Sequence, residues 1–93
     1  MSKEIVLNDY TFLVSETDEK GIIIFANDDF CKVAGYHIDE LIGQPHNIIR
    51  HKDMPKVAFK DLWETVKKGN IWTGYVKNRA KNGDFYWVYA TVF

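Results

Sequence analysis

The sequence predicts an α+β domain in which an antiparallel sheet is covered on one face by a helical connection. Two β-hairpin patterns, one in each half of the 93 residues, carry this prediction. Between them lie two short helical patterns and one long amphipathic one. Because all the helices fall between the hairpins, they are expected to cross one face of the sheet that the hairpins build.

The first hairpin is predicted over residues 12–25. Residues 12–17, FLVSET, have the composition of a strand, and Asp18–Gly21 are turn formers. Ile22–Phe25 is an unbroken run of β-branched and aromatic side chains. Such a run is typical of a strand that is covered on both faces.

Two short helices are predicted next. Asn27 stands before two aspartates, so it is the expected N-cap of a helix that ends at Gly35. The second helix is expected over residues 37–42, where Glu40 lies three residues after His37 and can complete a capping box.

A polar loop, residues 44–55, separates these short helices from the long one. It holds two histidines, an arginine and an aspartate between apolar elements. Asp53 followed by Pro55 predicts the start of the long helix, with Asp53 as its N-cap. The apolar stripe of that helix falls at i, i+3, i+4 and i+7, on Phe59, Leu62, Trp63 and Val66.

The second hairpin is predicted from residues 71–79 and 84–93, joined by a turn that contains Asn82-Gly83. Alternation along the last strand gives it two apolar faces. One face is expected to line the core. The other stays exposed unless a partner covers it, so a homodimer or a contact with flanking signalling domains is expected.

Composition excludes several classes of function. The net charge of −1 offers no basic surface for nucleic acid or for an anionic membrane, and the longest apolar run is far too short to span one. The single Cys31 excludes an internal disulfide and fits a reducing, cytoplasmic setting. No nucleophile–base pair, phosphate loop or metal-ligand spacing indicates an enzyme or a metal site. Residues 1–10 are expected to form an N-terminal cap segment, and residues 11–93 one domain.

Short motifs along this order of elements resemble the PAS domain: Asn27-Asp28-Asp29-Phe30, Gly35-Tyr36, Glu40-Leu41-Ile42-Gly43 and Lys81-Asn82-Gly83-Asp84-Phe85-Tyr86-Trp87-Val88. A second set resembles the N-terminal PAS domains of bacterial aerotaxis receptors and their relatives: Gly43-Gln44-Pro45-His46-Asn47, Arg50-His51, Asp53-Met54-Pro55, Trp72-Thr73-Gly74 and Val76-Lys77-Asn78-Arg79.

The resemblance covers roughly residues 10–93 and implies a PAS sensory domain. It implies non-covalent binding of FAD and the reporting of redox state or oxygen to a chemotaxis signalling module. The PAS fold normally has a fifth strand, whereas this chain ends within the fourth expected one, so the final strand is expected to be missing.

The same resemblance implies a set of cofactor-binding residues in the polar loop. Arg50 would neutralise a phosphate or hydrogen-bond a flavin edge, His51 would share the lid over the cavity, and Asp53 would hold the arginine in place. The alternative is that Asp53 caps the helix while Arg50 and His51 are surface residues.

Three further residues complete the expected site. Trp72 offers a flat indole face to an aromatic ring, although core packing is the commoner role. Asn78, five residues before Gly83, would hydrogen-bond the flavin ring through its amide, or else bond its own backbone. Asn27 would cap its helix and also face the cavity.

Two other functions remain open from sequence. His46 or His51 would ligate iron if the domain were a haem gas sensor, although nothing in their spacing selects either. The domain would alternatively be a ligand-free PAS module for dimerisation and interaction. Cys31 lies outside the loop in which light-sensing relatives place their photoactive cysteine, so covalent flavin photochemistry is not expected.

Overall fold

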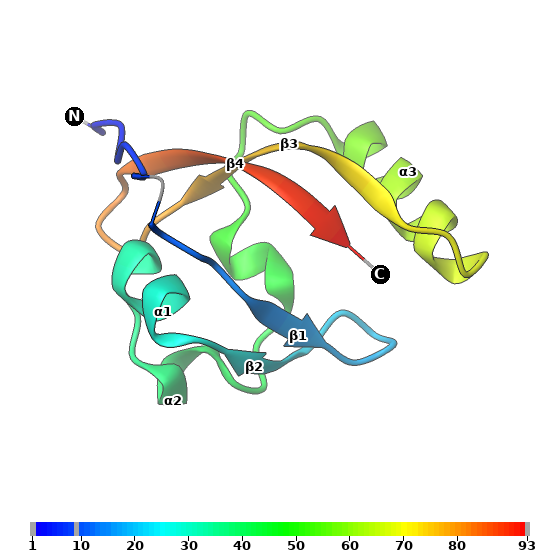
Figure 1. Cartoon of the computed structure of the whole chain (residues 1–93), viewed down its shortest axis with the longest axis horizontal. Coiled ribbons are helices and arrows are strands. Elements are labelled where there is room, and N and C mark those ends of the chain that lie inside the picture. The colour runs from blue at the N-terminus through cyan, green and yellow to red at the C-terminus, as the bar shows by residue number, and fades with distance from the viewer. Residues whose placement is uncertain (1, 9, 93) are drawn as a thin grey trace.

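The strands form two separate antiparallel ribbons in the computed structural model, which describes residues 2–8 and 10–92 (Figure 1). The elements in chain order are β1 Ser15–Thr17, β2 Ile23–Ala26, α1 Asp28–Ala34, α2 Ile38–Leu41, the 3₁₀ helix η1 His46–Ile49, α3 Lys56–Lys67, β3 Trp72–Arg79 and β4 Phe85–Val92. All helices lie between the two ribbons in sequence, so the predicted α+β class is confirmed. Within the described residues, the two hairpins do not join into the single sheet that was expected. None of these helices is long and apolar enough to cross a lipid bilayer.

The second hairpin matches its prediction closely. β3 and β4 pair without interruption from Trp72 opposite Val92 to Arg79 opposite Phe85. Gly83 in the turn has a φ of 95°, which a residue without a Cβ adopts at little cost. The first hairpin is shorter than expected, because residues 12–14 stay outside β1 and its pairing with β2 is irregular between Glu16 and Thr17.

The prediction that the Ile22–Phe25 strand is covered on both faces is wrong. Ile23 and Ala26 are buried, but Ile24 and Phe25 are exposed at 53% and 44%. Ile23 and Ala26 pack into the core with residues of the helices, whereas Ile24 and Phe25 leave about half of their surface in solvent. An unbroken apolar run reports composition and does not report which faces have a neighbour.

The two short helices carry the predicted caps. Asn27 accepts a hydrogen bond from the backbone of Phe30 at 2.9 Å, which begins α1, and Gly35 ends it with a φ of 76°. Glu40 accepts from the backbone of His37 at 3.0 Å at the start of α2. Glu40 also pairs with Lys81 in the β3–β4 turn, which ties α2 to the second ribbon.

The polar loop differs from its prediction at both ends. Its first part folds into η1, which sequence periodicity did not indicate. Its last part does not cap the long helix through Asp53, so that prediction is wrong: Pro55 is the N-cap residue of α3 and makes no side-chain cap bond. The Asp53 carboxylate instead forms an ion pair with Lys77 of β3, with 3.0 Å between Oδ2 and Nζ.

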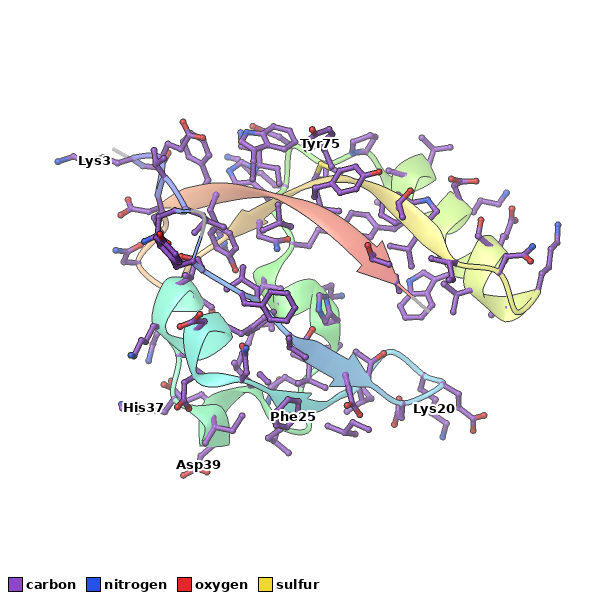
Figure 2. The ribbon with its side chains drawn as sticks, viewed as in Figure 1. Lys3, Lys20, Phe25, His37, Asp39 and Tyr75 are labelled. Atoms are coloured by element: carbon purple, nitrogen blue, oxygen red, sulfur yellow. The ribbon has the colours of Figure 1, made fainter. Side chains whose placement is uncertain are left out.

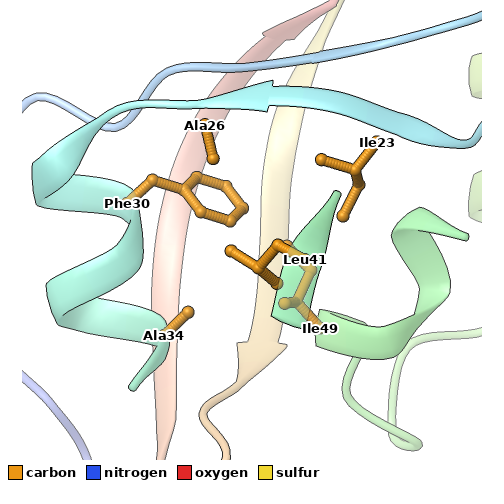
Figure 3. Packing of buried hydrophobic residues seen from close by; sticks show 6 residues of the cluster. All are labelled: Ile23, Ala26, Phe30, Ala34, Leu41 and Ile49. Atoms are coloured by element: carbon orange, nitrogen blue, oxygen red, sulfur yellow. The ribbon is translucent and has the colours of Figure 1, made fainter. Parts of the chain in front are cut away.

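The core lies where the first ribbon meets α1, α2 and η1. Its buried members converge in Figure 3 and are Ile23, Ala26, Phe30, Ala34, Leu41 and Ile49. The predicted stripe of α3 is inward-facing, with Leu62 buried and its three neighbours half-buried. The N-terminal segment joins the second ribbon, because Ile5 donates to the carbonyl of Phe85 at 2.7 Å.

Truncation of Ile49 tests this account of the core. Ile49 is fully buried, so Ile49→Ala is expected to lower the free energy of unfolding by about 2–5 kcal/mol through lost contacts and a residual cavity. The matched control is Ile24→Ala on the exposed face of β2, which should change it by less than about 1 kcal/mol. Urea unfolding followed by tryptophan fluorescence measures both. Equal losses in the two variants would contradict the assignment.

Candidate functional site

The backbone of residues 43–51 hydrogen-bonds to both ribbons. Three bonds join its first part to the first ribbon: Gly43 N–H to the Ile23 carbonyl, Ile23 N–H to Gln44 and His46 N–H to Gly21. Its last part runs beside β3, where the backbones of Arg50 and Asn78 form an antiparallel bridge. His51 N–H donates to the carbonyl of Lys77 at 3.2 Å. The predicted lid residues are therefore held against β3 by main-chain bonds.

Arg50 is half-buried and stacks on α3. Its guanidinium carbon lies 4.7 Å from the centre of the Phe59 ring. A guanidinium stacked on an aromatic face keeps the N–H groups along its edge free to bind an acceptor. Arg50 also lines a pocket of about 530 Å³ together with Ser2, Asn47, His51, Lys52, Arg79 and Gly83.

We expected Asp53 to hold Arg50 in place, but its carboxylate has other partners. It accepts from Lys77 at 3.0 Å and lies 3.6 Å from the Nδ1 atom of His51. The hydrogen bond from Lys77 holds the pKa of the Asp53 carboxyl below its ordinary value. His51 is buried, accepts from the Asp53 backbone at 3.1 Å and packs edge-on against Phe85. The pair Asp53–Lys77 thus braces the loop against the outer face of β3.

Trp72 lies at the opposite end of β3. Its indole nitrogen donates to Asp61 of α3 at 2.9 Å, and the ring covers Gly74. A Cβ built on Gly74 would come within 2.6 Å of the Trp72 ring, so the absence of a side chain there lets the indole lie flat on the strand. Asn78 lies six positions further along this extended strand, roughly 20 Å from Trp72.

Asn78 and Tyr86 face each other across the second ribbon. They are directly paired in the β3–β4 register, and both are buried on the inner side of the hairpin. The hydroxyl of Tyr86 has no hydrogen-bond partner among the described residues. Burial raises the pKa of Tyr86 far above its ordinary value, and the Asn78 amide beside the hydroxyl offsets part of this shift.

Asn27 belongs to the corner between β2 and α1. Besides capping α1, it accepts from Val14 at 3.1 Å and donates to the carbonyl of Phe12 at 2.7 Å. Both ends of its amide are therefore used by the chain itself. The cap is confirmed, and the cofactor contact of Asn27 stays a prediction.

The two histidines of the loop lie against different ribbons. His46 packs edge-on against Phe30, and its Nε2 atom lies 3.3 Å from the hydroxyl of Ser15 in β1. Burial lowers the pKa of His46 from its ordinary 6.5. His51, by contrast, contacts Phe85 of β4.

The structure brings the backbones of Arg50 and His51 against Asn78 and Lys77, and two residues that support them were not expected from sequence. Phe59 was assigned to the core stripe and also carries Arg50. Lys77 has no role in the predicted site, although it is the partner of Asp53. Strict alternation along β3 places Lys77 on the face opposite to Asn78, and that signal alone could have separated a bracing residue from an inward one.

The partly buried His46 leads us to predict a pH dependence of stability. Because the pKa of His46 is lowered in the folded domain, the unfolded chain takes up the proton first as the pH falls. The contribution of His46 to stability is therefore complete above pH 6.5 and is lost as the pH falls below that value. His46→Gln should therefore reduce the difference in unfolding free energy between about pH 7.5 and about pH 5.5. His37→Gln, at an exposed histidine, should leave that difference unchanged. Identical pH profiles for His46→Gln and the unmodified chain would contradict the prediction.

This architecture matches a known protein family. The family described as "PAS fold" matches residues 23–93. Over 84 residues the chain is 60% identical to the aerotaxis receptor of Escherichia coli K12, a match that covers 90% of this chain and 17% of the receptor. It is 29% identical over 75 residues to a nitrogen fixation regulatory protein of Klebsiella pneumoniae, covering 81% of this chain and 15% of that protein.

Among solved structures, the PAS domain of a protein from Colwellia psychrerythraea superposes with a TM-score of 0.74 at 26% identity. That match covers 85% of this chain and 66% of the other. The chain spans a small part of the length of both curated relatives. Family match and fold agree, and the chain belongs to the PAS-fold family.

Proposed function

We propose that this PAS domain, residues 11–93 with residues 1–10 as its cap, is a cytoplasmic sensor that binds FAD non-covalently and reports redox state or oxygen. The observation that carries the proposal is the 60% identity over 84 residues to an aerotaxis receptor. The proposed output is to a chemotaxis-type signalling module, and the role is sensory rather than catalytic.

The residues on the inner side of the hairpin and in the loop fit such a ligand. The Asn78 amide offers a donor and an acceptor side by side, which suits the alternating edge of a flavin pyrimidine. Arg50, stacked on Phe59 beside the basic pocket, suits an anionic or carbonyl group. Trp72 presents an indole at the far end of β3, and the unmet hydroxyl of Tyr86 leaves one more donor for a ligand.

Bound flavin would supply a redox centre whose charge and protonation change on reduction. The chain's part is to convert that change into a shift at its surface. Asn78 faces inward, and Lys77, its neighbour on β3, faces outward and is braced by Asp53. Arg50 and His51 are bonded to the backbone of these same two residues. A rearrangement at Asn78 would therefore act on both the loop and the outer face, which is allosteric if the two states differ in affinity for a partner.

The haem alternative receives less support from the geometry. The Nε2 atom of His46 lies against Ser15, and the Nδ1 atom of His51 accepts from the backbone of Asp53. Neither imidazole stands alone over an apolar pocket, as an axial ligand would. The ligand-free module remains the second candidate, and the unmet Tyr86 hydroxyl favours a ligand over it.

The outer face of the second ribbon suits a partner. Tyr75 and Tyr89 are exposed at 70% and 60% and contact each other edge-on, with ring centres 5.0 Å apart. Figure 2 shows Tyr75 on the side of the ribbon that points away from β1 and β2. An exposed aromatic patch of this kind is typical of an interaction surface. We propose that a second copy or a flanking signalling domain covers it.

An absorption spectrum of the purified chain tests the cofactor. Flavin gives a band near about 450 nm and haem a Soret band near about 400 nm, while a bare spectrum favours the ligand-free module. Asn78→Ala is expected to weaken FAD binding about tenfold, because the loss of a buried hydrogen bond to the ring is worth roughly 1.4 kcal/mol. The matched control is Asn70→Ala, at an exposed asparagine. Unchanged affinity in a folded Asn78→Ala variant would sink this site.

Solution sizing tests the outer face. The chain is expected to dimerise with rising concentration, and the double variant Tyr75→Ser, Tyr89→Ser should shift it to the monomer by removing the exposed aromatic surface. Val57→Ser, which changes an exposed apolar residue on α3, is the control and should dimerise as before. A chain that stays monomeric at every concentration assigns the face to a flanking domain rather than to a second copy.

A further inference from the structure

Tyr86 is the largest fully buried side chain among the described residues, and its hydroxyl has no hydrogen-bond partner among them. The residue has 0% exposure, and no described residue forms a hydrogen bond with the hydroxyl oxygen. A tyrosine hydroxyl has one hydrogen to donate and accepts as well. Buried polar groups in folded proteins nearly always have a partner, so each exception needs an explanation.

The surroundings of this hydroxyl define what the missing partner must be. Asn78 is the directly opposed residue on β3, and Tyr36, which follows α1, is near enough to contribute to the raised pKa of Tyr86. Burial is the dominant influence on the Tyr86 pKa and raises it well above the ordinary 10.0. The hydroxyl is therefore neutral at physiological pH and carries one hydrogen. The Asn78 amide beside it can supply a donor to the oxygen, so the hydrogen of the hydroxyl is what lacks a partner, and that partner is an acceptor.

Core packing alone does not account for a tyrosine at this position. A phenylalanine would fill the same space and would bury no hydroxyl. The hydroxyl therefore destabilises the domain whenever it has no partner. It stabilises the domain once an acceptor lies within hydrogen-bond distance of its oxygen, and an acceptor next to Asn78 would belong to whatever the Asn78 amide binds.

We propose that the Tyr86 hydroxyl donates a hydrogen bond to a carbonyl oxygen or ring nitrogen of the ligand bound next to Asn78. The inference rests on the proposed function, in which that ligand is a flavin. A flavin pyrimidine edge carries both kinds of acceptor beside an N–H group, so the Asn78–Tyr86 pair can read neighbouring atoms of one ring. Tyr86 then acts as a determinant of ligand class, because it favours ligands with an acceptor at this point over purely apolar ones.

The test compares the unmodified 93-residue chain with Tyr86→Phe and, as a matched control, with Tyr10→Phe at a highly exposed tyrosine. Urea unfolding is measured first on the flavin-free proteins. Tyr86→Phe is expected to unfold at a higher urea concentration, because the unmet hydroxyl is gone. Titration with FAD is measured second, and Tyr86→Phe is expected to bind about tenfold more weakly. Tyr10→Phe should match the unmodified chain in both measurements.

The opposite signs of the two effects separate a ligand contact from a structural role. If flavin-free Tyr86→Phe unfolds at a lower urea concentration, the hydroxyl already has a partner in the folded chain, such as a buried water, and the inference is overturned. Equal FAD affinity in Tyr86→Phe and the unmodified chain overturns it as well, and leaves the proposed function standing. If the unmodified chain binds no FAD, the proposed function fails together with the ligand role, while the flavin-free comparison still decides whether the hydroxyl is unmet.

Discussion

The main-chain hydrogen bonds of residues 43–51 are the constraint on which the arrangement of this domain depends. The two ribbons do not pair with each other, and this segment bonds to β2 at one end and to β3 at the other. Backbone bonds of this kind do not depend on side-chain identity, so the positions of Arg50 and His51 follow from the chain path. Along the same path Ile49 lies in the core, and the next residue, Arg50, lines the pocket that it shares with Lys52 and Arg79. Core and candidate site are in this way parts of one short stretch.

Much of the fold could be predicted because its signals are local. The Asn-Gly turn, the Asn27 cap and the Gly35 stop act within a few residues, and the structure has each of them where the pattern indicated. Two features escaped for physical reasons. The helix η1 is too short to show a periodicity. The exposed side of β2 depends on which elements pack there, and composition does not carry that information.

The sequence could predict which residues belong to the candidate site, but it could not predict which residues they contact. The motifs brought Arg50, His51 and Asn78 to notice, and the structure holds them together through the pairing of the loop with β3. The partner of Asp53 escaped because Lys77 and Arg50 are both plausible cations, and only the direction of each side chain decides between them. Tyr86 escaped because an aromatic residue on an inner face looks like core until its hydroxyl is followed to a missing partner.

The contact between the N-terminal segment and β4 bears on how the domain keeps its sheet edges from pairing with other chains. Glu4 forms a parallel bridge with Phe85, and the backbones of Lys3 and Ile5 bond to the same residue. The edge of β4 that faces away from β3 is thus covered at its first residue, while within the described residues no element covers it further along. Unpaired strand edges are templates for strand addition. A chain that adds to this edge of β4 would therefore pair along its later part, beyond the bridge already formed at Phe85.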